Sequence, residues 1–251
     1  METTTEVEYL TRPDGRVAFD VEGAGPLVLL VPGMGDLRST YRHLAPTLRA
    51  AGYRVAVTDL RGHGDSDPTF ETYGDETTAG DLIALVEHLG GPALLVGNSM
   101  GAGAAALVAA LRPDLVSGLV LIGPFVRDPD VSLATRLILR LVMARPWGAR
   151  AWVSYLPKLY AGQRPADFDS YRAAIARSLS RPGYAWAFWQ TTRQTTHAPV
   201  EARLPQVTAP TLVIMGELDP DWTDPAAEAQ WIATTMGGDV VMVPDAGHYP
   251  Q

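Results

Sequence analysis

Short runs of apolar residues alternate along this chain with longer stretches in which apolar residues recur every three or four positions. The runs lack inside-outside alternation, which is typical of strands covered on both faces of a sheet. They lie at residues 27–31, 54–58, 93–96, 119–122, 211–215 and 240–243. Helical spacing is found at residues 37–51, 76–89, 100–111 and 225–236. Strands that alternate with helices pair in parallel, so the pattern predicts a doubly wound, mostly parallel α/β sheet.

Two stretches near the N-terminus show the other pattern. Residues 7–10 and 17–21 alternate apolar and polar side chains on either side of Pro13, Asp14 and Gly15. This arrangement predicts an antiparallel hairpin at the sheet edge.

The alternation of strands and helices stops after the run at 119–122, which is the sixth predicted strand when the two strands of the hairpin are counted. Residues 125–200 contain helical patterns without a buried-strand run, and they hold eleven of the twenty aromatic residues. They also carry eleven Arg and Lys against four Asp, a charge of +7, whereas the whole chain stands at −8. We therefore expect a basic, aromatic helical cap at 125–200, inserted into a core made of residues 1–124 and 201–251.

Composition narrows the function classes. With 251 residues, one α/β body is expected. The absence of cysteine excludes thiolate metal sites, disulfides and a cysteine nucleophile, and we predict no metal. The acidic balance argues against nucleic acid and favours a small-molecule substrate. The apolar runs at 26–32 and 133–144 are too short or too charged to be inserted across a bilayer, and residues 1–8 lack a secretory pattern, so a cytoplasmic location is expected.

The strongest chemical signal is Gly97-Asn98-Ser99-Met100-Gly101, between the strand at 93–96 and the helix at 100–111. A serine on a tight strand-to-helix turn projects its hydroxyl above the sheet edge, and glycines two residues to either side relieve the crowding. The helix that follows offers amide groups and a positive dipole end to an oxyanion. Ser99 is therefore predicted to be a nucleophile.

A serine nucleophile requires a base and an acid that orients the base. His248 follows the last predicted strand, which places it at the same sheet edge as Ser99. His63 lies in a turn-rich loop where an imidazole usually supports backbone. A surface role is expected for His197, and contact with substrate is the alternative, since it lies on the cap side. The remaining histidines, His43 and His88, fall within helical stretches.

The orienting acid is predicted to follow the strand at 211–215. Asp219 is favoured there over Glu217 and Asp221, and Asp128 is a further alternative after an earlier strand.

The order Ser99, Asp219, His248, the segment Asp59-Leu60-Arg61-Gly62-His63-Gly64-Asp65-Ser66 and the helical insertion together resemble the α/β-hydrolase family, over essentially the whole chain. The resemblance implies a nucleophile, an acid and a base at Ser99, Asp219 and His248. It also implies an oxyanion hole from the amides of Met34 and Met100. Gly33 in the same loop as Met34, and Asn98, are expected to border the substrate.

A serine at position 99 disfavours the dehalogenases and epoxide hydrolases of the family, which resemble this chain but use aspartate there. The segment from Gly97 to Gly101 is similar to the elbow of hydrolases that cleave carbon-carbon bonds in ring-fission products. Those enzymes usually have a tryptophan after the histidine, where this chain has Tyr249, and Asn98 can equally bond within the elbow. Many relatives have His-Gly at the position of Pro32-Gly33, and most add a final helix beyond the position of Gln251.

The hypothesis that follows is a cofactor-independent serine hydrolase that cleaves a carboxylic ester or lactone of an apolar or aromatic substrate. Two alternatives stay open: carbon-carbon hydrolysis of a vinylogous diketone, and a receptor that uses the pocket to hold a ligand. The pocket is expected to draw on four aromatic residues of the cap: Trp152, Tyr155, Trp186 and Trp189. Aromatic residues at helical spacing also commonly form the core of a cap, and its positive charge can hold it to the acidic body or attract a carboxylate.

Overall fold

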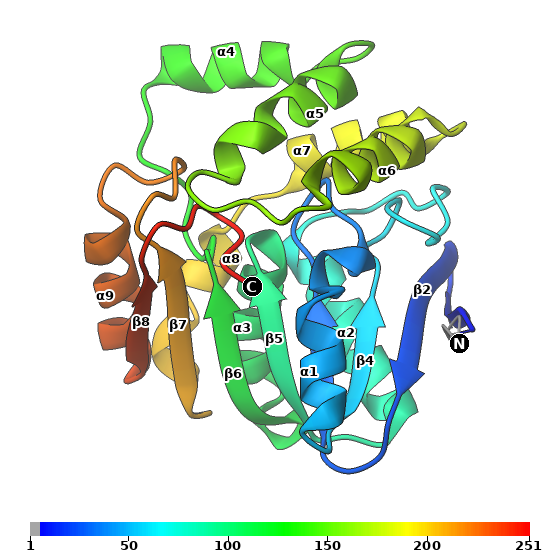
Figure 1. The fold of residues 1–251 in the computed structure, drawn as a ribbon, viewed down its shortest axis with the longest axis vertical. Coiled ribbons are helices and arrows are strands. Elements are labelled where there is room, and N and C mark those ends of the chain that lie inside the picture. Colours follow the sequence, from blue (N-terminus) through cyan, green and yellow to red (C-terminus); the bar gives the residue numbers. More distant parts are fainter. Residues whose placement is uncertain (1–5) are drawn as a thin grey trace.

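A single eight-stranded sheet organises the chain (Figure 1). The computed structural model describes residues 6–251, so part of the predicted N-terminal segment 1–8 lies outside the described residues. The strands follow the order β1-β2-β4-β3-β5-β6-β7-β8 across the sheet. Their bounds are β1 Glu8–Arg12, β2 Gly15–Glu22, β3 Leu27–Val31, β4 Arg54–Thr58, β5 Ala93–Asn98, β6 Val116–Ile122, β7 Thr211–Gly216 and β8 Asp239–Val243.

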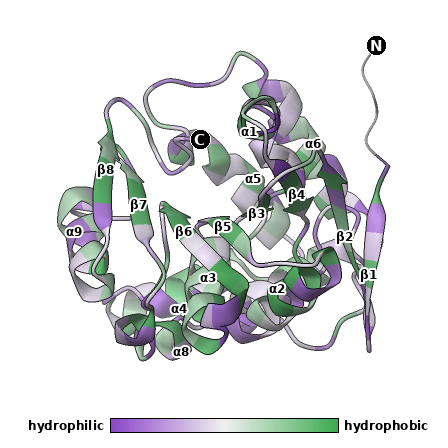
Figure 2. Cartoon of the chain, turned by 90° about the horizontal axis from the view of Figure 1, so that it is seen from below, coloured by the Kyte–Doolittle hydropathy of each residue, from purple (hydrophilic) through white to green (hydrophobic). Residues whose placement is uncertain are grey.

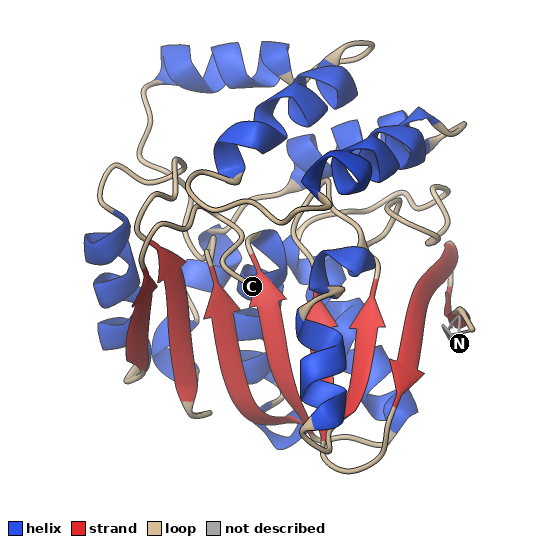
Figure 3. Ribbon diagram, in the orientation of Figure 1, coloured by secondary structure: helices blue, strands red, loops and turns tan. Residues whose placement is uncertain are grey.

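The pairing confirms the predicted topology. β1 and β2 form the expected antiparallel hairpin, and β2 joins the sheet antiparallel to β4. The strands from β4 to β8 pair in parallel. Their arrowheads point to the edge that the inserted helices cover (Figure 3), so the loops after β3, β5, β7 and β8 gather there.

Helices cover both faces of the sheet (Figure 2). On one face lie α2 (Asp75–Leu89), α3 (Met100–Leu111) and α9 (Pro225–Met236), and on the other lies α1 (Leu44–Ala50). Eight of the twelve residues of α3 are glycine or alanine, and most of these are buried, which lets the helix approach the central strands closely. The buried side chains form separate clusters on the two faces, as a sheet covered on both faces requires.

The prediction of one continuous helix at 37–51 is wrong. The structure has a 3₁₀ turn, Arg38–Tyr41, followed by α1. Pro46 has no amide hydrogen, so a continuous α-helix would leave the Arg42 carbonyl without its donor. The Arg38 amide instead donates to the Asp59 carboxylate at 2.8 Å, which ties this turn to the loop after β4.

The insertion after β6 is helical, as predicted, and lies over the strand ends (Figure 1). Its helices are α4 Leu133–Val142, α5 Gly148–Leu159, α6 Phe168–Ser180 and α7 Tyr184–Gln194, and the short α8, Ala198–Glu201, leads back toward the sheet. α5, α6 and α7 share a third hydrophobic cluster, which includes Leu156, Tyr171 and Phe188. Within residues 6–251, no helix combines the length and the apolar character that crossing a bilayer requires.

Candidate active site

Ser99 occupies a strained turn between β5 and α3. Its φ is 55° and its ψ −125°, a backbone conformation that few residues other than glycine adopt. A Cβ on Gly97 would overlap the backbone of Gly101 and Ala102, and a Cβ on Gly101 would overlap the carbonyl oxygen of Pro32. Gly97 is therefore needed for the turn itself and Gly101 for the close approach of residues 31 and 32 to α3, and Ser99 has the placement that the motif predicts.

His248 and Asp219 meet at the same edge of the sheet. His248 lies on the loop after β8 and Asp219 on the loop after β7, and both are buried. Nδ1 of His248 lies 2.8 Å from Oδ2 of Asp219. The Asp221 amide donates to the other Asp219 oxygen at 3.0 Å. The pair thus has a fixed orientation that leaves Nε2 as the free ring nitrogen.

Asp221 is a second carboxylate beside the same imidazole. Its Oδ2 lies 3.7 Å from Nδ1 of His248, and its Oδ1 accepts a hydrogen bond from the Tyr155 hydroxyl at 2.9 Å. Burial raises the pKa of the Asp221 carboxyl. Burial also opposes a charge on His248, but Asp219 and Asp221 outweigh it, so the pKa of His248 is raised above 6.5. Position 221 therefore couples helix α5 of the insertion to the imidazole.

Four contacts bring Ser99 and His248 to neighbouring positions. The Ser99 amide donates to the Ile122 carbonyl at 2.9 Å, and a Cβ on the next residue, Gly123, would lie 3.0 Å from Nδ1 of His248. The Asn98 side-chain amide donates both to the Ile122 carbonyl, at 3.1 Å, and to the His248 carbonyl, at 3.2 Å. No hydrogen bond joins the Ser99 hydroxyl to His248 within residues 6–251; without a ligand such bonds are often long and shorten on substrate binding.

The sequence left two roles open for Asn98, bordering the substrate or bonding within the elbow, and its side-chain amide has the second role. It is fully buried, and both of its amide hydrogens point to backbone carbonyls. It links the strand end that carries Ser99 to the loop that carries His248.

The loop after β3 approaches the nucleophile closely. A Cβ on Gly33 would lie 2.8 Å from the Ser99 Cβ and 3.4 Å from its Oγ. The amides of Met34 and Met100, for which the family resemblance implies an oxyanion hole, donate to no acceptor within the described residues. Backbone groups without partners beside a serine hydroxyl can stabilise a developing negative charge.

His63 supports this loop, which confirms the backbone role predicted for it. Its Nε2 accepts a hydrogen bond from the Gly35 amide at 2.9 Å, and its Nδ1 lies 2.8 Å from the Arg61 carbonyl. Burial lowers the pKa of His63 to about 4, so the ring is neutral at physiological pH.

Two of the four predicted cap aromatics contact the candidate site. Trp152 donates from its indole nitrogen to the Gly35 carbonyl at 2.9 Å, and Tyr155 holds Asp221. Trp186 instead packs edge-on against Tyr73, with ring centres 6.2 Å apart, and Trp189 packs against the Arg193 guanidinium.

The surface role expected for His197 is wrong. The side chain is buried and its Nδ1 lies 2.6 Å from Oδ2 of Asp75 at the start of α2. Asp128, the further alternative for the orienting acid, accepts hydrogen bonds from the His197 amide and the Thr196 hydroxyl. Both residues therefore hold the end of the insertion onto the body. The local sequence around His197 could not predict this burial, because its partner Asp75 lies 122 residues away and only the fold brings the two together.

Sequence reasoning missed Asp36. It follows the loop after β3, is buried, and accepts a hydrogen bond from the Tyr171 hydroxyl of α6. Its Oδ2 has no partner within the described residues, and burial raises its pKa to about 6. The usable signal was an acidic residue directly after a glycine-rich loop at a strand end.

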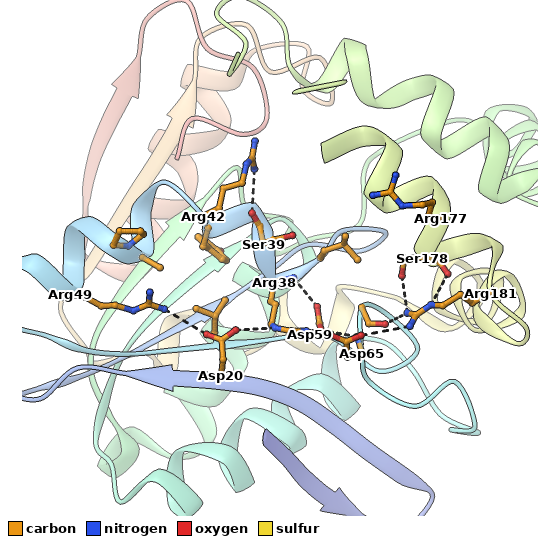
Figure 4. Close-up of a pocket in the computed structure, with 16 residues that line it drawn as sticks. Asp20, Arg38, Ser39, Arg42, Arg49, Asp59, Asp65, Arg177, Ser178 and Arg181 are labelled. Carbon is orange, nitrogen blue, oxygen red and sulfur yellow. Dashed lines mark hydrogen bonds and ion pairs between the residues drawn. The ribbon is translucent and has the colours of Figure 1, made fainter. Parts of the chain in front are cut away.

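A separate cavity of about 610 Å³ lies beside α1 and is lined by none of Ser99, Asp219 and His248. Figure 4 shows Arg38 at its floor, between Asp20 on one side and Asp59 and Asp65 on the other. Arg181 from the insertion reaches the same group and donates to the Gly64 carbonyl. Part of the positive charge of the insertion thus holds it to the acidic body.

Asp219, Asp221 and His248 also place ligand atoms within 4.8 Å of one another, a spacing that a metal ion accepts. Nδ1 of His248 is already hydrogen-bonded to Asp219, and Asp221 is held by Tyr155. These contacts explain why the three side chains lie together: the two carboxylates orient the imidazole of His248, and the cluster needs no metal ion to account for it.

Comparisons with known proteins agree with the fold. The model of the "Alpha/beta hydrolase family" matches residues 28–251. The chain is 30% identical over 92% of its length to a rice protein, Oryza sativa subsp. japonica, named probable esterase D14L, and covers 87% of that protein. It is 32% identical, over 92% of its length and 90% of the relative, to a Mycobacterium tuberculosis protein named as a candidate non-heme bromoperoxidase, BpoC. A crystal structure of a probable hydrolytic enzyme from Pseudomonas aeruginosa PAO1 superposes with a TM-score of 0.80 at 26% identity, covering 100% of this chain and 91% of the other.

Proposed function

The chain belongs to the alpha/beta hydrolase family, and from that membership we propose that it is a cofactor-independent serine hydrolase that cleaves a carboxylic ester or lactone at Ser99. One observation carries the proposal. A serine held at φ 55° on a strand-to-helix turn lies beside a buried histidine whose Nδ1 is 2.8 Å from a buried carboxylate. An imidazole that a carboxylate orients near a strained serine supports acyl transfer to Ser99.

In the proposed reaction, Oγ of Ser99 attacks the carbonyl carbon of the ester while Nε2 of His248 takes the hydroxyl proton. The tetrahedral intermediate collapses, the C–O bond to the leaving group breaks, and His248 returns the proton to the leaving oxygen. Water then attacks the acyl-enzyme, with His248 again as the base, and releases the acid and free Ser99. Asp219 keeps the imidazole in the required tautomer and stabilises its charged form.

The negative charge of the intermediate is assigned to the amides of Met34 and Met100. Met100 is the first residue of α3, so the positive end of the helix dipole adds to its amide. The close approach of Gly33 to Ser99 supports the placement of the Met34 amide, because no side chain separates the two segments. Loss of one such donor typically costs about 10²–10³ in kcat.

We assign residues 125–200 as the cap over this site, and residues 1–124 and 201–251 as the hydrolase core. Trp152 and Tyr155 reach the oxyanion loop and Asp221 from the cap. Aromatic walls of this kind bury apolar ligand surface, which favours an apolar or aromatic substrate. Similarity to the esterase D14L supports an ester in particular.

The test is covalent labelling with a fluorophosphonate probe, followed by hydrolysis of p-nitrophenyl acetate. We expect one labelled serine per chain, at Ser99, and a burst of p-nitrophenol equal to the enzyme present, since the acyl-enzyme accumulates. Ser99→Ala removes both signals, whereas Ser117→Ala, which changes an exposed serine on β6, keeps them. An unlabelled wild-type protein without a burst overturns the proposal and favours ligand binding without turnover.

A series of p-nitrophenyl esters then defines the acyl group. If the cap aromatics line the acyl site, kcat/KM rises as the acyl chain lengthens from acetate, by up to about tenfold for each fully buried pair of methylenes. Consumption of a vinylogous diketone without esterase activity would instead favour carbon-carbon hydrolysis.

A further inference from the structure

Helix α4 presents its whole circumference to solvent. Every residue from Ser132 to Val142 is exposed, and no residue of α4 is buried. Six of these side chains are large and apolar, with exposed fractions between 43% and 72%: Leu133, Leu137, Ile138, Leu139, Leu141 and Val142. Folded proteins rarely leave so much contiguous apolar surface uncovered unless it contacts something else.

The apolar side chains of α4 form a continuous stripe. Leu133, Leu137 and Leu141 follow one another at a spacing of four, which aligns them along one side of the helix. Arg136 and Arg140 share the same spacing and line one border of the stripe. The helix also has its own N-terminal cap, because the Ser132 hydroxyl accepts from the Thr135 amide at 3.1 Å. α4 is thus an amphipathic helix held at the outer margin of the molecule (Figure 1).

The charge around α4 has one sign. Residues 131–166 contain five Arg and one Lys and no acidic residue. Within the described chain, Arg136 and Arg140 form no ion pair, and neither do Arg145 and Arg150 on the adjoining segment. Most arginines of the body, such as Arg12, are paired with carboxylates. The α4 region therefore combines exposed apolar surface with arginines that form no ion pair among residues 6–251.

Trp147 adds an aromatic residue at the end of the same helix. Its side chain is half exposed, and its indole nitrogen donates to the Leu141 carbonyl at 2.9 Å. The indole is thereby fixed beside the leucine stripe with much of its ring in solvent. An amphipathic aromatic ring in this position is typical of helices at a membrane interface.

We propose that α4 docks onto an anionic lipid surface. The leucine stripe and Trp147 enter the boundary between headgroups and acyl chains, and Arg136 and Arg140 bind lipid phosphates. With ten residues, α4 is about 15 Å long, so it lies along the surface. Charge complementarity selects lipid over a second copy of this chain, because a symmetric pairing of two α4 helices brings unpaired arginines together without an acidic residue between 131 and 166.

Vesicle flotation tests this proposal. The probes are vesicles of phosphatidylcholine alone and vesicles of phosphatidylcholine with phosphatidylglycerol. We expect binding to the second kind only, with affinity that falls as salt is added. Binding to neither kind, or equal binding to both, overturns the proposal.

Variants separate the two contributions. Leu137→Gln with Leu141→Gln removes two residues of the stripe and lowers partitioning by about tenfold or more. Arg136→Gln with Arg140→Gln lowers it by roughly tenfold and reduces its dependence on salt. The matched controls are Leu111→Gln, which changes an exposed leucine at the end of α3, and Arg16→Gln, which changes an exposed but paired arginine; both keep wild-type binding.

Two further measurements complete the test. Hydrolysis of soluble p-nitrophenyl acetate stays at the wild-type rate in both α4 variants, so loss of lipid binding is distinguished from loss of the proposed catalysis. Sedimentation without lipid gives the same mass for wild type and for the leucine variant. A dimer that the leucine variant dissociates would show that a second copy covers α4, and would overturn the lipid proposal.

Discussion

His63 and Gly35 are joined by a hydrogen bond of 2.9 Å in which the Gly35 amide donates to Nε2. Because Nε2 accepts, the ring proton is on Nδ1, which donates to the Arg61 carbonyl at 2.8 Å. The loop that passes Ser99 is therefore held by an imidazole from the loop after β4. Protonation of His63 would place a second donor against the Gly35 amide and break this contact.

The first prediction concerns the acid stability of this contact. The pKa of His63 falls from 6.5 to about 4 on folding, chiefly through burial. The stability that neutral His63 contributes is fully present above pH 6.5 and is lost as the pH falls toward 4, on the order of 3 kcal/mol. Urea unfolding between pH 7.5 and 4.5 measures it.

His63→Gln should reduce that pH-dependent loss by the same amount. A His63→Gln curve that runs parallel to wild type would contradict the assignment.

The second prediction separates Asp219 from Asp221. Asp219→Asn takes away the acceptor at 2.8 Å and lowers kcat by about 10³–10⁴, because the imidazole loses its tautomer and its counter-charge. Asp221→Asn lowers kcat by less than about tenfold, since Asp221 lies at 3.7 Å.

The pH profile of kcat/KM tests the role of Asp221 directly. Burial lowers the pKa of His248 while both carboxylates raise it, so removing Asp221 shifts the acid limb to lower pH. If Asp221→Asn is the more damaging change, the proposed assignment of the orienting acid is wrong.

The third prediction uses the close approach at Gly33. A Cβ there would lie 2.8 Å from the Ser99 Cβ and 3.2 Å from Oδ1 of Asn98, so Gly33→Ala forces the loop and the elbow apart. We expect kcat to fall by about 10² or more, since the donor and the nucleophile lose their relative placement. Steady-state kinetics with p-nitrophenyl acetate measures the effect.

The matched control is Gly80→Ala in α2, where a Cβ would meet only Nη2 of Arg12 at 3.9 Å. This change keeps the activity and stabilises the protein by about 0.5–1 kcal/mol through helix propensity. Wild-type activity in Gly33→Ala would argue against an oxyanion hole in this loop.

The fourth prediction concerns Asp36. Burial raises its pKa from 3.8 to about 6, so the folded protein binds more protons than the unfolded chain between these values. The free energy of unfolding therefore loses about 3 kcal/mol from this group as the pH rises through that window. Asp36→Asn removes the loss, and chemical unfolding should find the variant more stable than wild type at pH 8.

The contributions of Asp36 and His63 oppose each other between pH 4 and 6, so only the differences between variants resolve them. If Asp36→Asn is less stable than wild type at pH 8, a partner offsets the cost of burying the charged carboxylate, and the prediction is wrong.

Sequence alone determined what depends on near neighbours along the chain. The unbroken apolar runs predicted the strands of the parallel sheet, since a strand buried on both faces leaves no room for alternating polar residues. Gly97 predicted the turn at Ser99, since the crowding that it relieves arises within five residues, whereas Gly101 makes room for residues 31 and 32, which only the fold brings close. The order of strands placed His248 and Asp219 at one edge.

Tertiary structure decided which of the side chains at that edge meet. Asp219 and Asp221 lie two residues apart with the same chemistry, and only the path of the loop puts one at 2.8 Å and the other at 3.7 Å from Nδ1 of His248. The pairing of His197 with Asp75 joins elements 122 residues apart. The exposure of α4 also lies outside its own sequence, because an amphipathic pattern indicates an apolar face without specifying what covers it.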